Sequence, residues 1–233
     1  MNDLTKSVEI ITEILPETKT IILSRSGVDG SYIEGSSDLD LLVIGGEVEG
    51  VSGKLKEIQD KLGEKFDINY ITPEGITSGF AARNLHHEYQ YHGMDLYRLK
   101  NSFNVIYGDA ELLKLIPSIT LQEALDDILP YLRNTSIPTL KQHLQDSLDA
   151  KSFIHKEWKN LIVLIRTAFT LATNRIGSKL EALDYFKGEF PQYTAITDLL
   201  RSIYLKEQAQ TKISKDEIGS FIFNLEEVLA LSK

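Results

Sequence analysis

Asp38 and Asp40 lie one residue apart, where a loop rich in Gly and Ser runs into an apolar segment. Side chains of a β-strand alternate between its two faces, so both carboxylates are expected on the same face. Two carboxylates on one face repel each other unless a cation lies between them. Proteins usually hold Mg²⁺ with one or two carboxylates together with substrate phosphates. The pair therefore predicts a site for a magnesium-bound phosphate compound.

A third carboxylate, Asp67, belongs to the segment FDINYI at residues 66–71, which alternates as a strand does. In that alternation Asp67 shares the polar face with Asn69, and the opposite face takes Phe66, Ile68 and Tyr70. If this strand pairs beside the strand of Asp38 and Asp40, the three carboxylates converge.

The loop before Asp38 offers backbone N–H groups and hydroxyls of the kind that bind phosphate oxygens. Its small residues are Ser26, Gly27, Gly30, Ser31, Gly35, Ser36 and Ser37. The loop lacks the Gly-Lys-Ser/Thr of a P-loop, and no Gly-x-Gly-x-x-Gly opens a helix after it. A phosphate site of a different kind is therefore predicted.

The elements that must position these groups follow from the hydrophobic periodicity. Apolar residues at helical spacing predict helices over 3–15 and 51–62, and apolar or alternating segments predict strands over 18–24, 38–46 and 66–71. From about residue 80 onward strand signals weaken, and helices punctuated by Pro and Gly are expected. Three helix starts carry a capping box, formed by the pairs Thr120 and Glu123, Ser178 and Glu181, and Ser214 and Glu217.

The segment 160–176 is apolar nearly all round, which is typical of the central helix of a bundle. We place a domain boundary near residue 152. The predicted fold is α+β: residues 1–152 form a domain with a small mixed sheet and helices, and residues 153–233 form an α-helical bundle that completes a substrate site between the domains.

Composition limits the partners of the chain. Its 233 residues contain 25 basic and 34 acidic side chains, and the net charge of −9 disfavours nucleic acid and favours a cationic ligand. The absence of Cys excludes disulfides and thiolate zinc sites and favours the cytoplasm. The polar N-terminus and the lack of a long apolar run predict neither secretion nor a membrane span.

The pattern of Ser26, eleven residues and then Asp38-Leu39-Asp40, followed by a later strand acid, resembles the nucleotidyltransferase family related to DNA polymerase beta. Within that family the chain is similar to the aminoglycoside adenylyltransferases that modify streptomycin and spectinomycin. The similar segments cover much of the chain, at residues 28–30, 37–43, 95–108, 166–186 and 191–205. The resemblance implies that the domain of residues 1–152 is a nucleotidyltransferase domain.

The resemblance also implies an antibiotic-resistance reaction, the transfer of AMP from Mg-ATP to a hydroxyl of a cationic aminoglycoside with release of pyrophosphate. Ser26 and Ser37 would contact the nucleotide phosphates. Asp38 and Asp40 would hold the metal and, through it, the nucleotide. Asp67 would bind the acceptor hydroxyl and act as general base.

Two further residues are implied in the helical half of the chain. Asp184 matches a family acid that contacts the amino groups of the drug between the domains, and Lys206 lies near a family lysine for the triphosphate.

The sequence also departs from the family. Arg25 stands where the family has Gly, and Leu180 stands where the drug-modifying enzymes often carry a second acid. Two alternatives therefore stay open: a nucleotidyltransferase of the regulatory or antitoxin type that modifies a protein hydroxyl, and a catalytically inactive homologue that only binds nucleotide.

Overall fold

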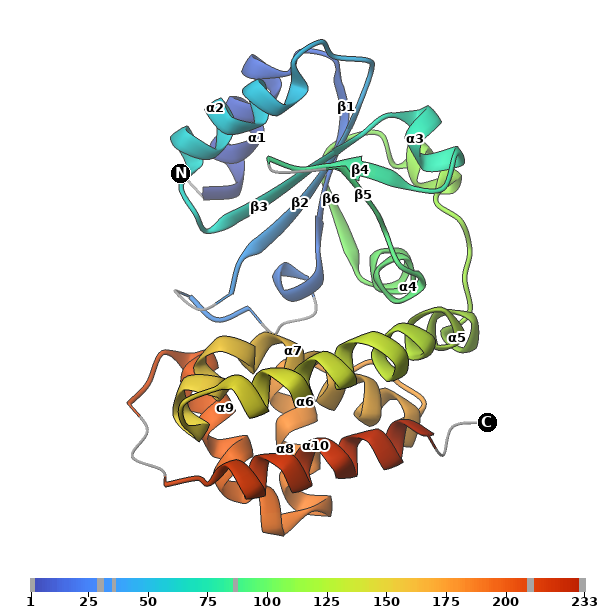
Figure 1. The fold of residues 1–233 in the computed structure, drawn as a ribbon. Coiled ribbons are helices and arrows are strands. Elements are labelled where there is room, and N and C mark those ends of the chain that lie inside the picture. The colour runs from blue at the N-terminus through green and yellow to red at the C-terminus, as the bar shows by residue number, and fades with distance from the viewer. Residues whose placement is uncertain (1–2, 29–31, 35–36, 86–87, 209–211, 231–233) are drawn as a thin grey trace. The chain divides into compact units, whose positions relative to one another are not determined.

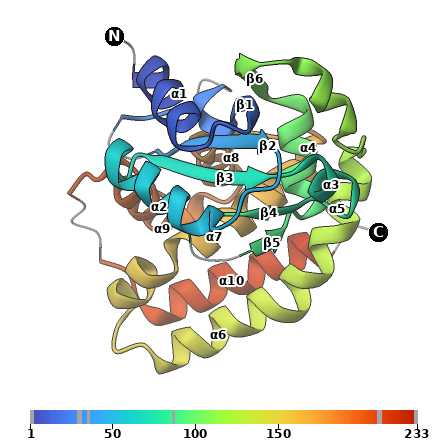
Figure 2. The ribbon, with the colours of Figure 1, turned by 90° about the horizontal axis from the view of Figure 1, so that it is seen from above.

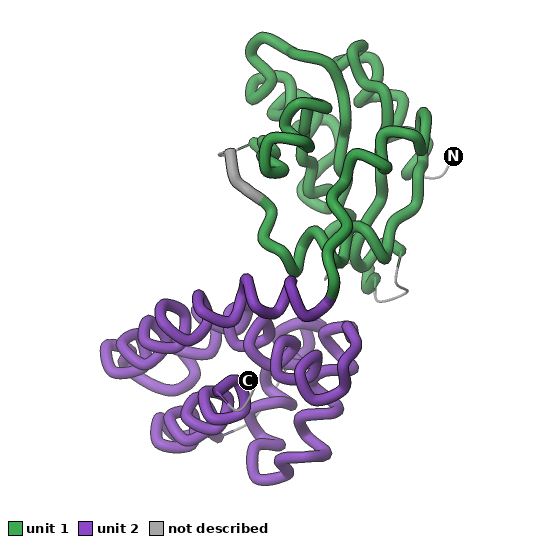
Figure 3. The backbone as a smooth tube through the Cα atoms, turned by 90° about the vertical axis from the view of Figure 1, so that its right-hand side faces the viewer, with its two compact units in different colours: residues 1–120 green, residues 121–233 purple. Residues whose placement is uncertain are grey.

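The computed structural model describes residues 3–28, 32–34, 37–85, 88–208 and 212–230. The chain forms two compact units, which Figure 3 shows in different colours: unit 1 comprises residues 1–120 and unit 2 comprises residues 121–233. Unit 1 contains the strands, and unit 2 is helical. The predicted α+β fold is confirmed.

Unit 1 is built around a six-stranded sheet of order β5-β4-β3-β2-β1-β6, visible in Figure 1. Its strands are β1 (Thr18–Ser24), β2 (Leu39–Gly45), β3 (Phe66–Ile71), β4 (Ala81–Arg83), β5 (Glu88–Gln90) and β6 (Phe103–Gly108). The pair β2–β3 is parallel and the other neighbours are antiparallel, so the predicted mixed sheet is confirmed. The prediction of helices alone after residue 80 was wrong. β4 and β5 have only three residues each, too few for an alternation to be recognised.

Helices cover both faces of this sheet (Figure 1). The helices of unit 1 are α1 (Asp3–Ile14), α2 (Val51–Leu62), α3 (Pro73–Thr77) and α4 (Gly93–Asn101), with 3₁₀ turns η1 (Arg25–Gly27) and η2 (Ala110–Leu115). On β2, Leu41 and Val43 join the core beneath α1 and α2, whereas Leu42 and Ile44 join the core beneath α3 and α4. Because both faces are buried, β2 is apolar at successive positions after Asp40.

At the far end of β3, the side chain of Tyr70 is buried and ties the strand to the chain that follows β2. Its hydroxyl donates a hydrogen bond of 2.5 Å to the carbonyl oxygen of Gly46. A Cβ on the adjacent Gly45 would collide with the Tyr70 hydroxyl, so only glycine fits at this position. Burial, together with the nearby carboxylates of Glu17 and Glu47, raises the pKa of Tyr70 from 10.0 to about 12.

This shift gives a pH prediction. Since the pKa of Tyr70 is higher in the folded protein, its neutral phenol contributes stability that is fully present below pH 10 and is lost as the pH rises through about 12. The ultraviolet absorbance of tyrosinate is measured against pH for the native chain and for Tyr70→Phe. The difference between the two absorbance curves is expected to have its midpoint near pH 12. A difference curve centred near 10, as for an exposed tyrosine, would contradict the burial argument.

Unit 2 is a bundle in which α7 is the longest helix. Its elements are α5 (Leu121–Tyr131), η3 (Leu132–Ser136), α6 (Ile137–Asp146), α7 (Ala150–Thr173), α8 (Lys179–Glu189), η4 (Pro191–Tyr193), α9 (Thr194–Leu205) and α10 (Lys215–Ala230). α7 contacts α6, α8, α9 and α10, so it is the central helix that the apolar segment predicted. Figure 2 shows α6 and α10 side by side, as their contacts also indicate. Within the described residues, no helix is both long and apolar enough to cross a membrane.

The chain passes from unit 1 to unit 2 between residues 120 and 121, whereas the sequence analysis placed the boundary near residue 152. Residue 152 lies in the first turn of α7, and the preceding helices belong to the bundle. Arg133 donates to the carbonyl oxygen of Leu229, and the Lys141 ammonium lies 2.5 Å from the Glu226 carboxylate. These contacts join residues 96 and 85 positions apart, and sequence periodicity carries no information about them.

Two of the predicted capping residues, Ser178 and Ser214, form side-chain hydrogen bonds at helix starts in unit 2. The Ser178 hydroxyl accepts a hydrogen bond of 3.1 Å from the backbone N–H of Glu181, at the start of α8. Before α10, Ser214 and Glu217 bond reciprocally: the Ser214 hydroxyl accepts from the Glu217 N–H, and the Glu217 carboxylate accepts from the Ser214 N–H at 2.7 Å. The hydrogen bonds that the Glu217 carboxylate accepts from the Ser214 N–H and the Ser214 hydroxyl lower the pKa of Glu217.

Candidate active site

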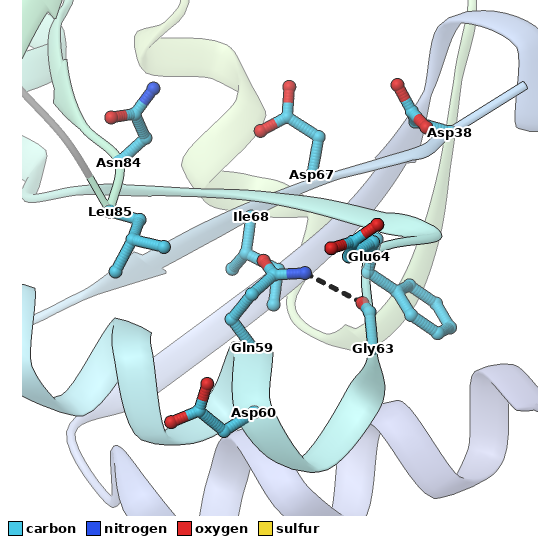
Figure 4. Close-up of a pocket in the computed structure, with 10 residues that line it drawn as sticks. Asp38, Gln59, Asp60, Gly63, Glu64, Asp67, Ile68, Asn84 and Leu85 are labelled. Carbon is cyan, nitrogen blue, oxygen red and sulfur yellow. Dashed lines mark hydrogen bonds between the residues drawn. The ribbon is translucent and has the colours of Figure 1, made fainter.

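The register of the parallel pair β2–β3 decides where the acidic residues lie. Asp40 on β2 and Asp67 on β3 are direct partners across the two strands. Both alternate with the apolar residues of the α1 and α2 face and therefore project toward the face covered by α3 and α4. Asp38 immediately precedes β2 and is exposed. Figure 4 shows the carboxylates of Asp38 and Asp67 projecting to the same side of the sheet.

A cavity of about 670 Å³ lies beside these residues in unit 1 (Figure 4). Four acidic residues line it: Asp38 and Asp67 at the strands, and Asp60 and Glu64 on α2 and the turn that follows it. Asn84 lines the cavity beyond Asp67. The described lining residues include no Lys or Arg. A concave surface lined by charges of one sign concentrates counter-ions, so this cavity favours a cationic ligand.

The two serines predicted to contact phosphate, Ser26 and Ser37, hydrogen-bond to the backbone of their own loop in this structure. The Ser26 hydroxyl donates a hydrogen bond of 3.0 Å to the carbonyl oxygen of Asp38. Ser37 is buried, and its hydroxyl accepts a hydrogen bond of 3.1 Å from the backbone N–H of Ile33. These bonds fix the entry to β2 and hence the position of Asp38. The other small loop residues Gly30, Ser31, Gly35 and Ser36 lie outside the described residues.

Arg25, the first residue of η1, contacts the acidic site directly. Its Nη1 donates to Oδ1 of Asp40 at 2.8 Å, and its Nη2 donates to Oδ1 of Asp95 at 3.2 Å. Asp95 lies in the first turn of α4, so the guanidinium joins η1, β2 and α4. The sequence reasoning missed Asp95. It marked Arg25 only as a departure from the family pattern, because no local pattern relates residues 70 positions apart.

The backbone of Arg25 is also unusual. Its φ is 55°, in the left-handed region that Gly adopts readily and other residues adopt at a cost of about 1–2 kcal/mol. Arg25 therefore holds a backbone conformation that suits Gly. The two ion pairs hold the Arg25 side chain against Asp40 and Asp95.

The donor set fits Mg²⁺ in kind, because carboxylate oxygens are the ligands that this ion prefers. Asp38 and Asp67 line the cavity, whereas Asp40 is 14% exposed and its Oδ1 is hydrogen-bonded to Arg25. Among the described residues, no group of three or more His, Asp or Glu side chains is arranged to hold a metal ion. A divalent ion at the Oδ1 atom of Asp40 would share that atom with the guanidinium of Arg25.

The two predicted site residues of unit 2 have structural contacts of their own. Asp184 is exposed on α8, and its Oδ1 accepts a hydrogen bond of 2.7 Å from Nη1 of Arg201 on α9. Lys206 is exposed and forms the C-cap of α9, with a φ of 57° and its backbone N–H bonded to the carbonyl oxygen of Ile203. Their assigned ligand contacts stay predictions.

No protein-family model matches the sequence, and no curated protein matches it. Among solved structures, the chain is similar over 98% of its length to 98% of the spectinomycin adenyltransferase AAD(9) from Enterococcus faecialis, whose crystal structure contains ATP and spectinomycin; the identity is 18% and the TM-score 0.69. A toxin–antitoxin structure with AMP-PNP matches 60% of the chain and 99% of its own, at 13% identity and a TM-score of 0.34. The first likeness confirms the predicted resemblance at the level of the fold. The second is too weak to carry an argument.

Proposed function

We propose that this chain is a nucleotidyltransferase that moves AMP from Mg-ATP to a hydroxyl group of a cationic small molecule, with an aminoglycoside as the leading acceptor. The observation that carries the proposal is the pairing of Asp40 with Asp67 on parallel neighbouring strands, next to Asp38 and an acidic cavity. The shared fold with a spectinomycin adenyltransferase supports it. With ATP as the substrate, the reaction would take place in the cytoplasm, and its outcome would be resistance to the antibiotic.

In this reaction the acceptor oxygen forms a bond to the α-phosphorus of ATP. The bond from that phosphorus to the oxygen it shares with the β-phosphorus breaks, and pyrophosphate leaves. Asp67 would accept the proton of the acceptor hydroxyl, for which it must lie within hydrogen-bond reach of that group. Asp38 and Asp40 would hold Mg²⁺, which when bound neutralises charge on the phosphates. Ser26 and Ser37 stay the predicted phosphate contacts.

The acceptor is proposed to be cationic for two reasons. The cavity beside Asp67 is lined by four carboxylates, and the whole chain has a net charge of −9. Amines of the acceptor would form charge-assisted hydrogen bonds with such groups, which are stronger than hydrogen bonds between neutral partners. Asp184 stays a predicted second contact for these amines.

The proposal is tested by incubating the protein with labelled ATP, Mg²⁺ and a panel of aminoglycosides while pyrophosphate is measured. We expect release that depends on both the acceptor and the metal, and transfer of the labelled AMP to the acceptor. Nucleotide binding without release on any acceptor would contradict the proposal.

Nucleotide binding without pyrophosphate release would favour the other candidate function, a protein that binds nucleotide without turnover. One observation supports this alternative: Oδ1 of Asp40, one of the two proposed metal ligands, is bonded to Arg25 at 2.8 Å. If the alternative is correct, the variant Asp38→Ala will bind nucleotide as the native chain does, and neither protein will need a divalent ion for binding.

A further inference from the structure

The ion pairs of Arg25 place a cation of the protein itself at the acidic site. Asp40 and Asp67 are direct partners on adjacent strands, where neighbouring backbones lie about 4.8 Å apart. Carboxylates at this spacing on one face repel each other, and a nearby positive charge stabilises their ionised forms. The guanidinium of Arg25, 2.8 Å from Oδ1 of Asp40, supplies such a charge without any bound metal.

The position of Arg25 makes it a competitor of a divalent ion. The guanidinium hydrogen bond occupies part of the lone-pair capacity of Oδ1, the atom it shares with any metal bound there, and the ligand distance for Mg²⁺ is only about 2.0–2.1 Å. A positive charge that stays beside Asp40 also repels an arriving cation. Arg does not lose its proton in proteins, so raising the pH does not remove this competing charge.

The second ion pair keeps the guanidinium in place. Nη2 of Arg25 lies 3.2 Å from Oδ1 of Asp95, which belongs to α4 and is 28% exposed. The guanidinium therefore binds two carboxylates from different elements at once. A side chain that is anchored at two points loses less entropy when it binds either one.

We propose that Arg25 is an internal cation that sets the affinity of this site for divalent ions. A metal ion at Asp40 binds against the charge of the guanidinium or displaces it, so the native chain needs a higher concentration of divalent ion than a chain without this charge. The inference rests on the proposed function in one respect, that the site takes a metal-bound nucleotide, and it adds the residue that determines the metal requirement.

The test measures metal binding rather than activity. The full-length chain is titrated with Mn²⁺ alone, and the free ion is followed by its electron paramagnetic resonance signal. The variant Arg25→Gly removes the charge and suits the backbone φ of 55°. We expect it to bind Mn²⁺ about tenfold more tightly or better, as judged from the effect of one neighbouring charge on a carboxylate.

Three further variants complete the test. Arg25→Asn also removes the charge with a residue that tolerates positive φ, and it gives the answer if Arg25→Gly does not fold. The double variant Arg25→Gly with Asp40→Asn is expected to lose the gain, because the gain arises at Asp40. Lys187→Ala is the control for net charge, since it removes one cation from an ion pair with Asp198 in unit 2.

The outcomes separate the two proposals. Equal Mn²⁺ affinity in the native chain and both neutral Arg25 variants, or no Mn²⁺ binding in any of them, overturns the role of Arg25. A gain of the same size in Lys187→Ala also overturns it. Tighter Mn²⁺ binding in the neutral Arg25 variants supports the role of Arg25 even when no acceptor releases pyrophosphate, a result that contradicts only the proposed reaction.

Discussion

Replacement of Asp67 by asparagine is expected to lower the rate of AMP transfer by about 10²–10⁴-fold, the usual effect of removing a general base. Asparagine has nearly the same shape as aspartate but cannot accept the proton of the acceptor hydroxyl. Asp67 lies on a strand between two paired neighbours, β2 and β4, so the substitution is not expected to move the backbone. The loss should therefore appear in kcat, with the fold unchanged by circular dichroism.

The measurement is the initial rate of pyrophosphate release with ATP, Mg²⁺ and the best acceptor of the panel. Glu57→Gln serves as the control, because it removes a carboxylate from the exposed surface of α2, where Glu57 pairs with Lys61 at 3.1 Å. This control should keep the native rate. Full activity in Asp67→Asn would refute the assigned role of Asp67.

Asp40→Asn should also strongly reduce the release of pyrophosphate, but with a different dependence on metal concentration. It weakens metal binding, so a higher Mg²⁺ concentration should restore part of its activity, whereas Asp67→Asn should not respond to added metal. Unchanged activity in Asp40→Asn at low Mg²⁺ concentration would remove Asp40 from the proposed metal site.

Replacement of Phe221 by alanine is expected to lower the free energy of unfolding of unit 2 by about 3–5 kcal/mol, the usual cost for a fully buried phenylalanine. Phe221 lies on α10 and is 0% exposed. Its ring packs edge-on against Phe186 of α8 and Tyr193 of η4, with ring centroids 5.7 and 5.2 Å away. Alanine would leave a cavity where three elements of the bundle meet.

The same helix provides a matched control, since Phe223 on α10 is 55% exposed. Phe223→Ala should change the free energy of unfolding by no more than about 0.5 kcal/mol, as surface substitutions usually do. Urea denaturation followed by tryptophan fluorescence reports on unit 2 selectively, because the one Trp of the chain, Trp158, lies on α7. Equal losses in the two variants would contradict the packing described for Phe221.

Local patterns predicted the part of the fold that holds the acidic residues. The apolar segment 18–24 became β1 with its predicted bounds, and the alternation of 66–71 became β3. Alternation also put Asp40 with Asp38, and Asp67 with Asn69, on the polar face of each strand, and the register then made Asp40 and Asp67 partners. β6 was missed although Phe103, Val105 and Tyr107 alternate, because this edge strand is too exposed to show a continuous apolar run.

The sequence by itself determined that three carboxylates lie on predicted strands and that a cation is needed between those on one face. These features depend on residue type and on the two-residue period of a strand. Only the tertiary structure decided which strands are neighbours, that Asp40 faces Asp67, and that Arg25 of the same chain binds Asp40 and Asp95. Such contacts join segments distant in the chain, and they are fixed by sheet register and helix packing, which no local period encodes.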